Sequence, residues 1–278
     1  MCERYVLVSK IEKIEKTFNV FQKTPLLYKE RYNIGAGGTG LIITSGHPTE
    51  MQTGQFGFSP SGSEKRLYLI NARAEGGRNK EDNPEYSGAM NIIVKPVFRE
   101  AIRNKRCLVI ADCFYAGDKD LGLNKPHLVY LKERRPFAFA GVYNEWTNPE
   151  TGENILTYAI ITIYPNELML KINCNRCPVI LKGGQERKYL NPDSSLATIM
   201  HILEPYPSGL MNAYPVSAMV NDVNNNSKEL VQSKGQKIYA EEPAIISSRK
   251  RIKFNRDSVE VVPEWLMKLR EEEMKKKG

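Results

Sequence analysis

Four apolar runs follow one another in the middle of the chain: RCLVI (106–110), HLVYL (127–131), FAFAGV (137–142) and LTYAIITI (156–163). They are rich in Val, Ile, Phe and Tyr and have the length of buried strands. Turn-forming residues separate them, namely Gly117-Asp118 and the stretch from Asn148 to Gly152. This region therefore predicts consecutive strands at the centre of a β-rich core.

Shorter segments on both sides complete the predicted fold. We expect further strands over 3–10, 41–44, 55–58 and 67–71, and helices over 11–22, 96–104, 166–171, 184–189, 194–203 and 227–232. The glycine-rich stretch 35–40 lacks the Gly-Lys-Ser/Thr ending of a P-loop, and the polar stretch 76–94 indicates an inserted loop. Many short strands with few helices indicate an α+β fold, a single domain with a mixed, β-barrel-like core and peripheral helices.

We place this domain at residues 2–240. Residues 241–278 are basic and highly charged, which predicts a partly helical tail. No apolar run reaches the ~18–20 residues of a membrane span, and no secretory signal is visible. We therefore expect a cytoplasmic protein that does not associate with membranes, and we expect it to be a monomer.

The composition favours a polyanionic partner. The net charge is +8, from 40 Lys and Arg against 32 Asp and Glu, and DNA or RNA comes first among such partners. Five cysteines, an odd number, argue against a disulfide framework in a cytosolic protein. Cys174 and Cys177 have the spacing of a redox or metal-binding pair, but no second pair of Cys or His completes a zinc site. We therefore expect no metal and no cofactor.

Cys2 follows Met1 directly. Because aminopeptidases remove Met before small residues, we expect the mature chain to start with Cys2. An N-terminal cysteine carries an amine with a pKa of ~7.7–8.0 and a thiol with a pKa of ~8.5, and both are partly nucleophilic at neutral pH. With an aldehyde, the amine forms an imine and the thiolate closes on it to give a thiazolidine ring. Taken alone, a cysteine at position 2 is more often incidental.

A series of motifs, in order along residues 2–235, resembles the SRAP (SOS response-associated peptidase) family. Cys2-Glu3-Arg4-Tyr5 resembles the family's N-terminus, and Gln55 to Pro60 resembles its Trp-Gly-Leu strand. Asn71-Ala72-Arg73-Ala74-Glu75 matches the family's central motif letter for letter, and the stretches 106–115 and 176–181 follow in the expected order. The resemblance implies a single SRAP-like α+β domain.

The resemblance also implies a role for each matched residue. Cys2 would be the nucleophile that captures the ring-opened sugar of an abasic site in single-stranded DNA, and Asn71 would hydrogen-bond that sugar. The DNA-binding residues would be three arginines that hold phosphates and an aromatic residue that stacks on bases: Arg4, Arg73, Arg176 and Phe56.

Two catalytic positions of the family are altered. Where the family has a glutamate after Phe-Tyr, this chain has Ala116. Where the family has a histidine, counting back from Pro178 gives Cys174, whereas aligning the preceding Lys171-Ile172 gives Asn173. These groups would form the acid/base pair that opens the sugar and resolves the adduct, and such groups typically contribute ~10²–10⁴-fold each. Glu3 also replaces the family's glycine, which places a carboxylate beside the N-terminus.

These departures leave several functions open. In the first, the chain captures abasic sites covalently through Cys2 as a thiazolidine DNA–protein crosslink, an activity classed with those of peptidases, hydrolases or lyases in this family. In the second, it is a degenerate SRAP paralogue that binds single-stranded DNA without efficient catalysis. A more distant third is a thiol redox protein that uses Cys174 and Cys177.

Overall fold

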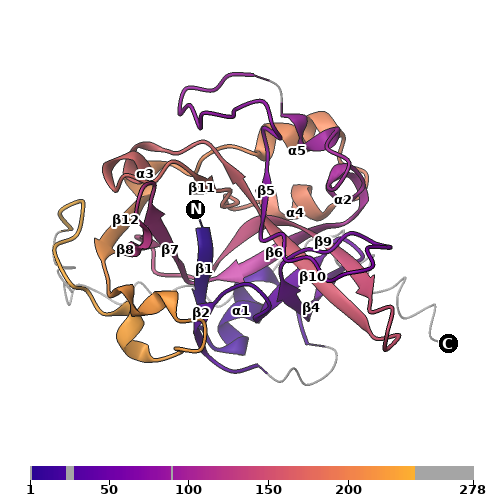
Figure 1. Ribbon diagram of the computed structural model, residues 1–278, viewed down its shortest axis with the longest axis horizontal. Coiled ribbons are helices and arrows are strands. Elements are labelled where there is room, and N and C mark those ends of the chain that lie inside the picture. Colours follow the sequence, from indigo (N-terminus) through magenta and orange to yellow (C-terminus); the bar gives the residue numbers. More distant parts are fainter. Residues whose placement is uncertain (1, 23–27, 89, 242–278) are drawn as a thin grey trace, which may run out of the picture. The chain divides into compact units, whose positions relative to one another are not determined.

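A closed ring of strands forms the centre of the fold (Figure 1). The computed structural model describes residues 2–22, 28–88 and 90–241. The ring consists of β3 (Thr39–Thr44), β4 (His47–Phe56), β6 (Arg106–Ala111), β9 (Phe137–Thr147) and β10 (Asn154–Ile163). β10 closes it by pairing with β9 on one side and, in parallel, with β4 on the other. The predicted α+β fold with a barrel-like core is confirmed.

The apolar runs of the sequence supply the barrel interior. Every residue of β6 is buried, and Ile42, Phe139 and Ile160 from three other strands are fully buried within the same core. Gly40 in β3 is required for this packing, because a Cβ there would lie 2.0 Å from the Tyr5 hydroxyl and 2.3 Å from the Tyr158 hydroxyl.

A second sheet packs beside the barrel, with all its strand pairs antiparallel. Its order is β12 (Met211–Pro215), β8 (Gly122–Leu131), β7 (Cys113–Asp118), β1 (Cys2–Leu7) and β2 (Arg31–Ile34). Side chains alternate between its faces: Phe114 and Ala116 belong to the main core, whereas Cys113 and Tyr115 belong to a smaller cluster on the other face.

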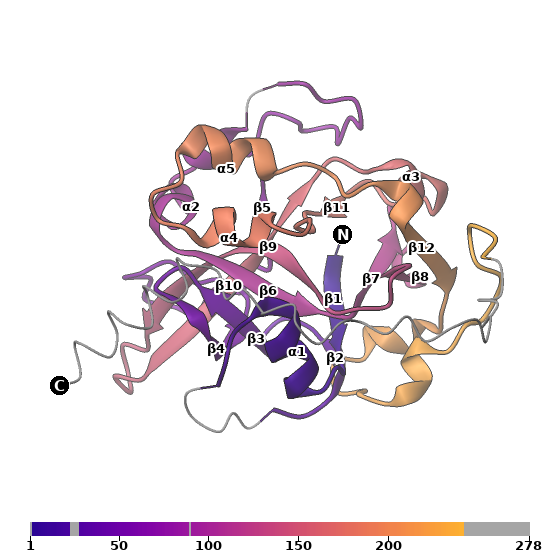
Figure 2. The same ribbon diagram turned by 180° about the vertical axis from the view of Figure 1, so that it is seen from behind.

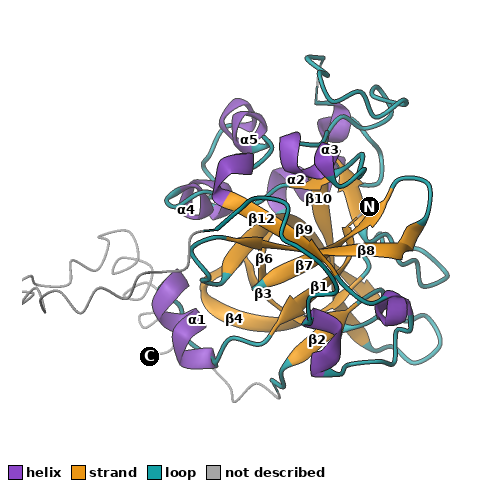
Figure 3. Ribbon diagram, turned by 90° about the vertical axis from the view of Figure 1, so that its left-hand side faces the viewer, coloured by secondary structure: helices purple, strands orange, loops and turns teal. Residues whose placement is uncertain are grey.

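Helices and short strands surround the two sheets (Figures 2 and 3). The helices are α1 (Ile11–Phe18), α2 (Arg99–Asn104), α3 (Glu167–Lys171), α4 (Gln185–Leu190) and α5 (Leu196–Ile202), and 3₁₀ turns cover Asn91–Ile93, Ser208–Leu210, Ala218–Asn221 and Lys228–Val231. β5 (Asn71–Arg73) pairs in parallel with β10, and β11 (Cys177–Pro178) pairs with the end of β10. None of the described helices is long and apolar enough to cross a membrane.

The structure differs from the predicted elements in several places. Gly117 and Asp118, expected as a turn, are the last two residues of β7. β4 begins at His47, although only 55–58 was predicted, because Thr49 and Glu50 are buried and hide the usual alternation. The helix predicted over 11–22 ends at Phe18, where Asn19 takes a left-handed conformation with φ 52°. The predicted helix 227–232 is a 3₁₀ turn. Met1–Tyr239 form one compact unit, and the predicted tail lies, apart from Glu241, outside the described residues.

Candidate active site

The sheet places Cys2, Ala116 and a histidine in one row. The Cα of Cys2 pairs with that of Ala116 in β7, and Ala116 pairs in turn with His127 in β8. Ala116 and His127, as directly opposed residues of antiparallel strands, occupy the same face of the sheet. The glutamate position of the family therefore lies between the N-terminal cysteine and His127, a residue that the sequence analysis did not select.

A carboxylate lies two residues beyond Ala116. Asp118 is buried, and its carboxylate accepts hydrogen bonds from the backbone amides of Asp120 (2.9 Å) and Leu121 (3.2 Å) and from Asn173 Nδ2 (3.0 Å). The Asn173 hydrogen bond, with those from the backbone, lowers the pKa of Asp118 to about 2. Asp118 is thus a fixed negative charge at neutral pH. The sequence showed it only as a turn residue, and its position two residues after the vacant acid slot was the available signal.

The two alternatives for the family's histidine occupy different environments. Asn173 has φ 56°, a left-handed conformation that Asn tolerates, and its side chain reaches Asp118. Cys174 is 1% exposed, and its Sγ lies 3.4 Å from the backbone oxygen of Arg176 inside the core. Asn173 therefore contacts the strand that carries Ala116, whereas Cys174 faces away from it. Figures 1 and 3 show α3, just before Asn173, near the N-terminal end of β1.

Asn71 carries a buried polar atom that is not satisfied. It begins β5, opposite Ile160 of β10, and its Oδ1 has no hydrogen-bond partner among the described residues. A buried amide oxygen without a donor costs about 1–3 kcal/mol, so such atoms call for an explanation. A ligand that donates a hydrogen bond to Asn71 would remove this cost.

Arg176 is buried in an ion pair rather than exposed to solvent. Its side chain is 2% exposed, and its Nη1 and Nη2 each donate to the Glu75 carboxylate at 2.9 Å. Burial alone would raise the pKa of Glu75, but the hydrogen bonds and charge of Arg176 hold it below its ordinary value. The prediction that Arg176 binds phosphate is therefore corrected: its guanidinium is occupied by Glu75 and fixes the central motif.

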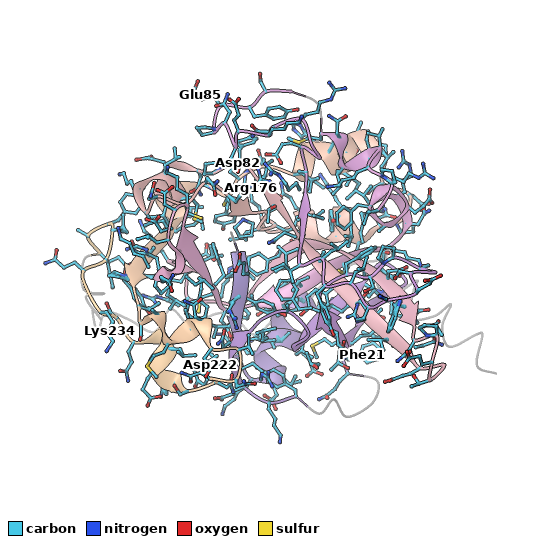
Figure 4. All side chains as sticks on the ribbon, in the orientation of Figure 1. Phe21, Asp82, Glu85, Arg176, Asp222 and Lys234 are labelled. Carbon is cyan, nitrogen blue, oxygen red and sulfur yellow. The ribbon has the colours of Figure 1, made fainter. Side chains whose placement is uncertain are left out.

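Asp82 links Arg73, the arginine of the central motif, to this pair. Its carboxylate accepts hydrogen bonds from Arg73, from Arg176 Nη1 (3.3 Å) and from Asn175 Nδ2 (2.9 Å). Figure 4 shows Asp82 and Arg176 side by side, below the loop that carries Glu85. Arg73 keeps about a third of its side chain exposed (32%), and its Nε has no partner among the described residues. Arg73 is therefore the arginine of the motif that remains accessible.

Phe56 is a core residue. It is 0% exposed, stacks on Tyr158 with 5.4 Å between ring centroids, and meets the edge of Tyr5 at 5.6 Å. The prediction that Phe56 stacks on a base is therefore corrected. An exposed aromatic lies beside the next residue, Gly57: Tyr68 is 52% exposed, and the Arg66 guanidinium lies 4.8 Å from its ring centroid.

Arg4 lies against the glycine-rich loop. It donates to the Asn33 side chain (3.4 Å) and to the backbone oxygen of Asn221 (3.0 Å), and a Cβ on Gly35 would come within 2.9 Å of its Nη1. Burial lowers the pKa of Arg4, and the charges of Glu3 and Asp222 oppose that shift. The guanidinium is thus held in place but only partly enclosed.

The other cysteines are unreactive by environment. Cys107, Cys113, Cys174 and Cys177 are buried free thiols. Burial raises the pKa of Cys107 and of Cys113 and raises that of Cys177 to about 12, so these three hold little thiolate at neutral pH. Among the described residues, no three His, Cys, Asp or Glu side chains are arranged to hold a metal ion.

Comparison with known proteins identifies the family. The profile of the SOS response associated peptidase (SRAP) family matches residues 1–223. The chain belongs to the SRAP family. This SRAP protein is 37% identical over 240 residues to the abasic site processing protein YoqW of Bacillus subtilis (strain 168), covering 84% of this chain and 100% of that protein. It is 28% identical over 178 residues to the abasic site processing protein HMCES of Xenopus tropicalis, covering 54% of this chain and 49% of that one.

Solved structures share the SRAP architecture. A protein from Bacteroides thetaiotaomicron superposes with a TM-score of 0.70 at 27% identity, over 84% of this chain and 99% of that chain. A protein from Bordetella bronchiseptica shares the fold with a TM-score of 0.60 at 22% identity, over 78% of this chain and 100% of that one. The barrel and the second sheet are therefore an arrangement that this chain has in common with other proteins.

Proposed function

We propose that this protein processes abasic sites in single-stranded DNA by forming a covalent adduct at Cys2. The observation that carries the proposal is the position of Cys2: it begins β1, which pairs with β7, so the sheet holds the N-terminus opposite Ala116. Relatives named as abasic site processing proteins support the substrate class. The unsatisfied Oδ1 of Asn71 supports a role for that residue in binding the sugar.

The chemistry follows from an N-terminal cysteine. The amine condenses with the aldehyde of the opened sugar, and the thiol then adds to the imine to close a thiazolidine. Met1 must be removed for this reaction, because the amine of residue 2 is otherwise an amide. The buried environments of Cys107, Cys113 and Cys177 leave Cys2 as the reactive thiol of this proposal.

The DNA strand needs cations and an exposed aromatic surface. Arg73 and Arg4 supply guanidinium groups that are partly exposed, and guanidinium binds phosphate in a bidentate manner. Tyr68, with Arg66 beside it, supplies the aromatic surface that the buried Phe56 does not, and stacking on such a surface contributes ~1–3 kcal/mol per base. Arg176 supports this surface indirectly, by fixing Glu75 in the central motif.

The test is intact mass spectrometry after incubation with a single-stranded oligonucleotide that carries one abasic site. We expect the purified protein to lack Met1 and to gain the mass of the oligonucleotide minus one water. Cys2→Ala and a variant with one alanine retained ahead of Cys2 should give no adduct, and Cys113→Ala, which removes a buried thiol, should still give it. An adduct that persists in Cys2→Ala contradicts the proposal.

A second candidate function is DNA binding without efficient capture. It is favoured by Ala116 at the position of the family's glutamate and by Cys174 or Asn173, neither of them a histidine, at the position of its histidine. Under this alternative, the protein binds the abasic oligonucleotide with the affinity it shows for an undamaged one, and the mass spectrum of the incubated mixture shows unmodified protein.

A further inference from the structure

His127 is the titratable side chain that faces the vacant acid position. It pairs directly with Ala116 across β7 and β8. Residues 127, 129 and 131 alternate onto one face of β8, and Val129 and Leu131 belong to the main core, as Ala116 does. His127 therefore lies at the end of the barrel-facing side of the sheet, in the row that begins with Cys2.

The imidazole is buried but not satisfied. His127 is 8% exposed, and its Nδ1 has no hydrogen-bond partner among the described residues. A buried ring nitrogen without a partner loses its hydrogen bonds to water and gains none in return. Histidine is also the side chain whose ordinary pKa suits proton transfer near neutral pH. No contact among the described residues therefore offsets the free energy of burying this nitrogen.

Strand spacing sets the separation between Cys2 and His127. Neighbouring strands lie about 4.7–4.9 Å apart, so the backbones at Cys2 and His127 are separated by about 10 Å, with the single methyl group of Ala116 between them. A longer side chain at position 116 would fill that interval. Alanine at position 116 carries no group that can transfer a proton, so His127 is the side chain next to it in the row that can.

We propose that His127 is a catalytic residue of this protein, the proton-transfer group that takes over the role of the missing glutamate and histidine. This inference rests on the proposed function, since it concerns the capture of an abasic sugar by Cys2. Asp118 acts as a positioning residue, because its fixed negative charge lies near the imidazole and stabilises the imidazolium when it forms.

Each proton that leaves one group in the reaction is taken up by another. Neutral His127 takes the proton of the C1 hydroxyl as the bond from C1 to the ring oxygen breaks, and water protonates that oxygen, leaving hydroxide. The Cys2 amine adds to the aldehyde, and the imidazolium returns its proton to the departing hydroxyl group, which leaves as water with an iminium. The thiol loses its proton to the hydroxide, and the thiolate closes on the iminium carbon. The net reaction joins amine, thiol and aldehyde and releases one water.

The surroundings of His127 keep it in the neutral form required of a base. Burial lowers its pKa, the positive charge of Lys125 lowers it further, and the negative charge of Asp118 opposes both. Lys125 Nζ lies 3.8 Å from Asp118 Oδ2, so the Asp118 carboxylate interacts with the charge of Lys125 as well as with His127. His127 therefore becomes protonated only below its ordinary pKa of ~6.5.

The test measures the rate of adduct formation by the Met1-free protein with an abasic oligonucleotide, from about pH 5 to about pH 8. Below about pH 7 the Cys2 amine, with an ordinary pKa of ~7.7–8.0, is mostly protonated, so its loss of a proton gives log rate a slope of about one against pH. Protonation of His127 should steepen the slope to about two at the acidic end. His127→Gln, which cannot titrate, should keep a slope of about one below about pH 7 and react ~10²-fold more slowly or worse near neutral pH.

Controls separate this role from a structural one. His201→Gln changes an exposed histidine in α5 and should leave the rate and the slope unaltered. Affinity for an undamaged oligonucleotide and the unfolding midpoint should match between His127→Gln and wild type. If that variant does not fold, the wild-type profile still decides: a slope of one down to pH ~5 overturns the role of His127.

The outcomes also separate this inference from the proposed function. If wild-type protein forms no adduct, the proposed function fails and the inference fails with it. If wild-type protein forms the adduct and His127→Gln matches its rate and profile, the function stands and the role of His127 is overturned.

Discussion

In the buried ion pair of Arg176 and Glu75, the arginine stabilises the fold instead of binding a ligand. Both side chains are nearly inaccessible, and two hydrogen bonds of 2.9 Å join them. A buried charge is tolerated only when its partner is present. The arginine thus holds the end of the Asn71–Glu75 motif against the core, and the more exposed Arg73 is left to bind phosphate.

Arg176→Ala should therefore destabilise the protein strongly. Removing one partner of a buried pair costs about 3–5 kcal/mol, whereas Arg73→Ala, at a more exposed site, should cost about 1 kcal/mol or less. Urea unfolding measures both. Because the pKa of Glu75 is lowered in the fold, its contribution is present above its ordinary pKa and is lost as the pH falls through the lowered value. If the two variants lose the same free energy of unfolding, Arg176 is not a buried structural group.

At the scale of elements, the 76–88 loop controls the accessible arginine. Asp82 in this loop accepts hydrogen bonds from both Arg73 and Arg176, and Arg73 Nη2 also donates to the backbone oxygen of Asn79 at 2.7 Å. A carboxylate on a guanidinium occupies the position that a phosphate oxygen would take. Binding of DNA at Arg73 therefore competes with the loop.

Asp82→Ala should increase the affinity for single-stranded DNA. With the carboxylate removed, Arg73 can neutralise one more phosphate, and the slope of log K against log salt should steepen by ~0.7. Glu85→Ala is the matched control, since it removes the same charge from an exposed position of the loop, shown away from Arg176 in Figure 4. Titrations at several salt concentrations measure both variants. Identical salt slopes for the two would show that Asp82 does not compete with phosphate.

At the scale of the whole molecule, Ile238 and Tyr239 hold the end of the compact unit in place. Ile238 donates its backbone amide to Ala213 (2.9 Å), Tyr239 donates its amide to the Asn212 side chain (3.0 Å), and both side chains pack on the main core. These contacts attach the end of the unit to β12 at the edge of the second sheet.

Two truncations should therefore behave differently. A chain that ends after Glu241 keeps these contacts. A chain that ends after Gly235 loses them and should be less stable by about 1–3 kcal/mol, the value of burying one large apolar side chain. Thermal and urea unfolding measure the difference. Equal unfolding midpoints for the two shortened chains would show that Ile238 and Tyr239 do not stabilise the unit.

The sequence alone determined the fold class and the family, because both depend on local patterns. Apolar runs separated by turns predicted β6, β9 and β10 of the barrel and part of β8 in the second sheet, and a series of short motifs predicted the family. The sequence also identified Ala116 as the position where the family's glutamate is missing, and Asn173 or Cys174 as the position where its histidine is missing. Patterns of this kind are read along the chain, so they do not depend on which segments meet in space.

Only the tertiary structure decided which of the predicted residues are accessible. Phe56 and Arg176 have the residue types of DNA contacts, yet one is packed between Tyr5 and Tyr158 and the other is paired with Glu75. Strand register likewise placed His127 opposite Ala116, a pairing that the residue types do not reveal. Burial and register arise from contacts between segments far apart in the chain, and the free energy of those contacts overrides what a residue type suggests by itself.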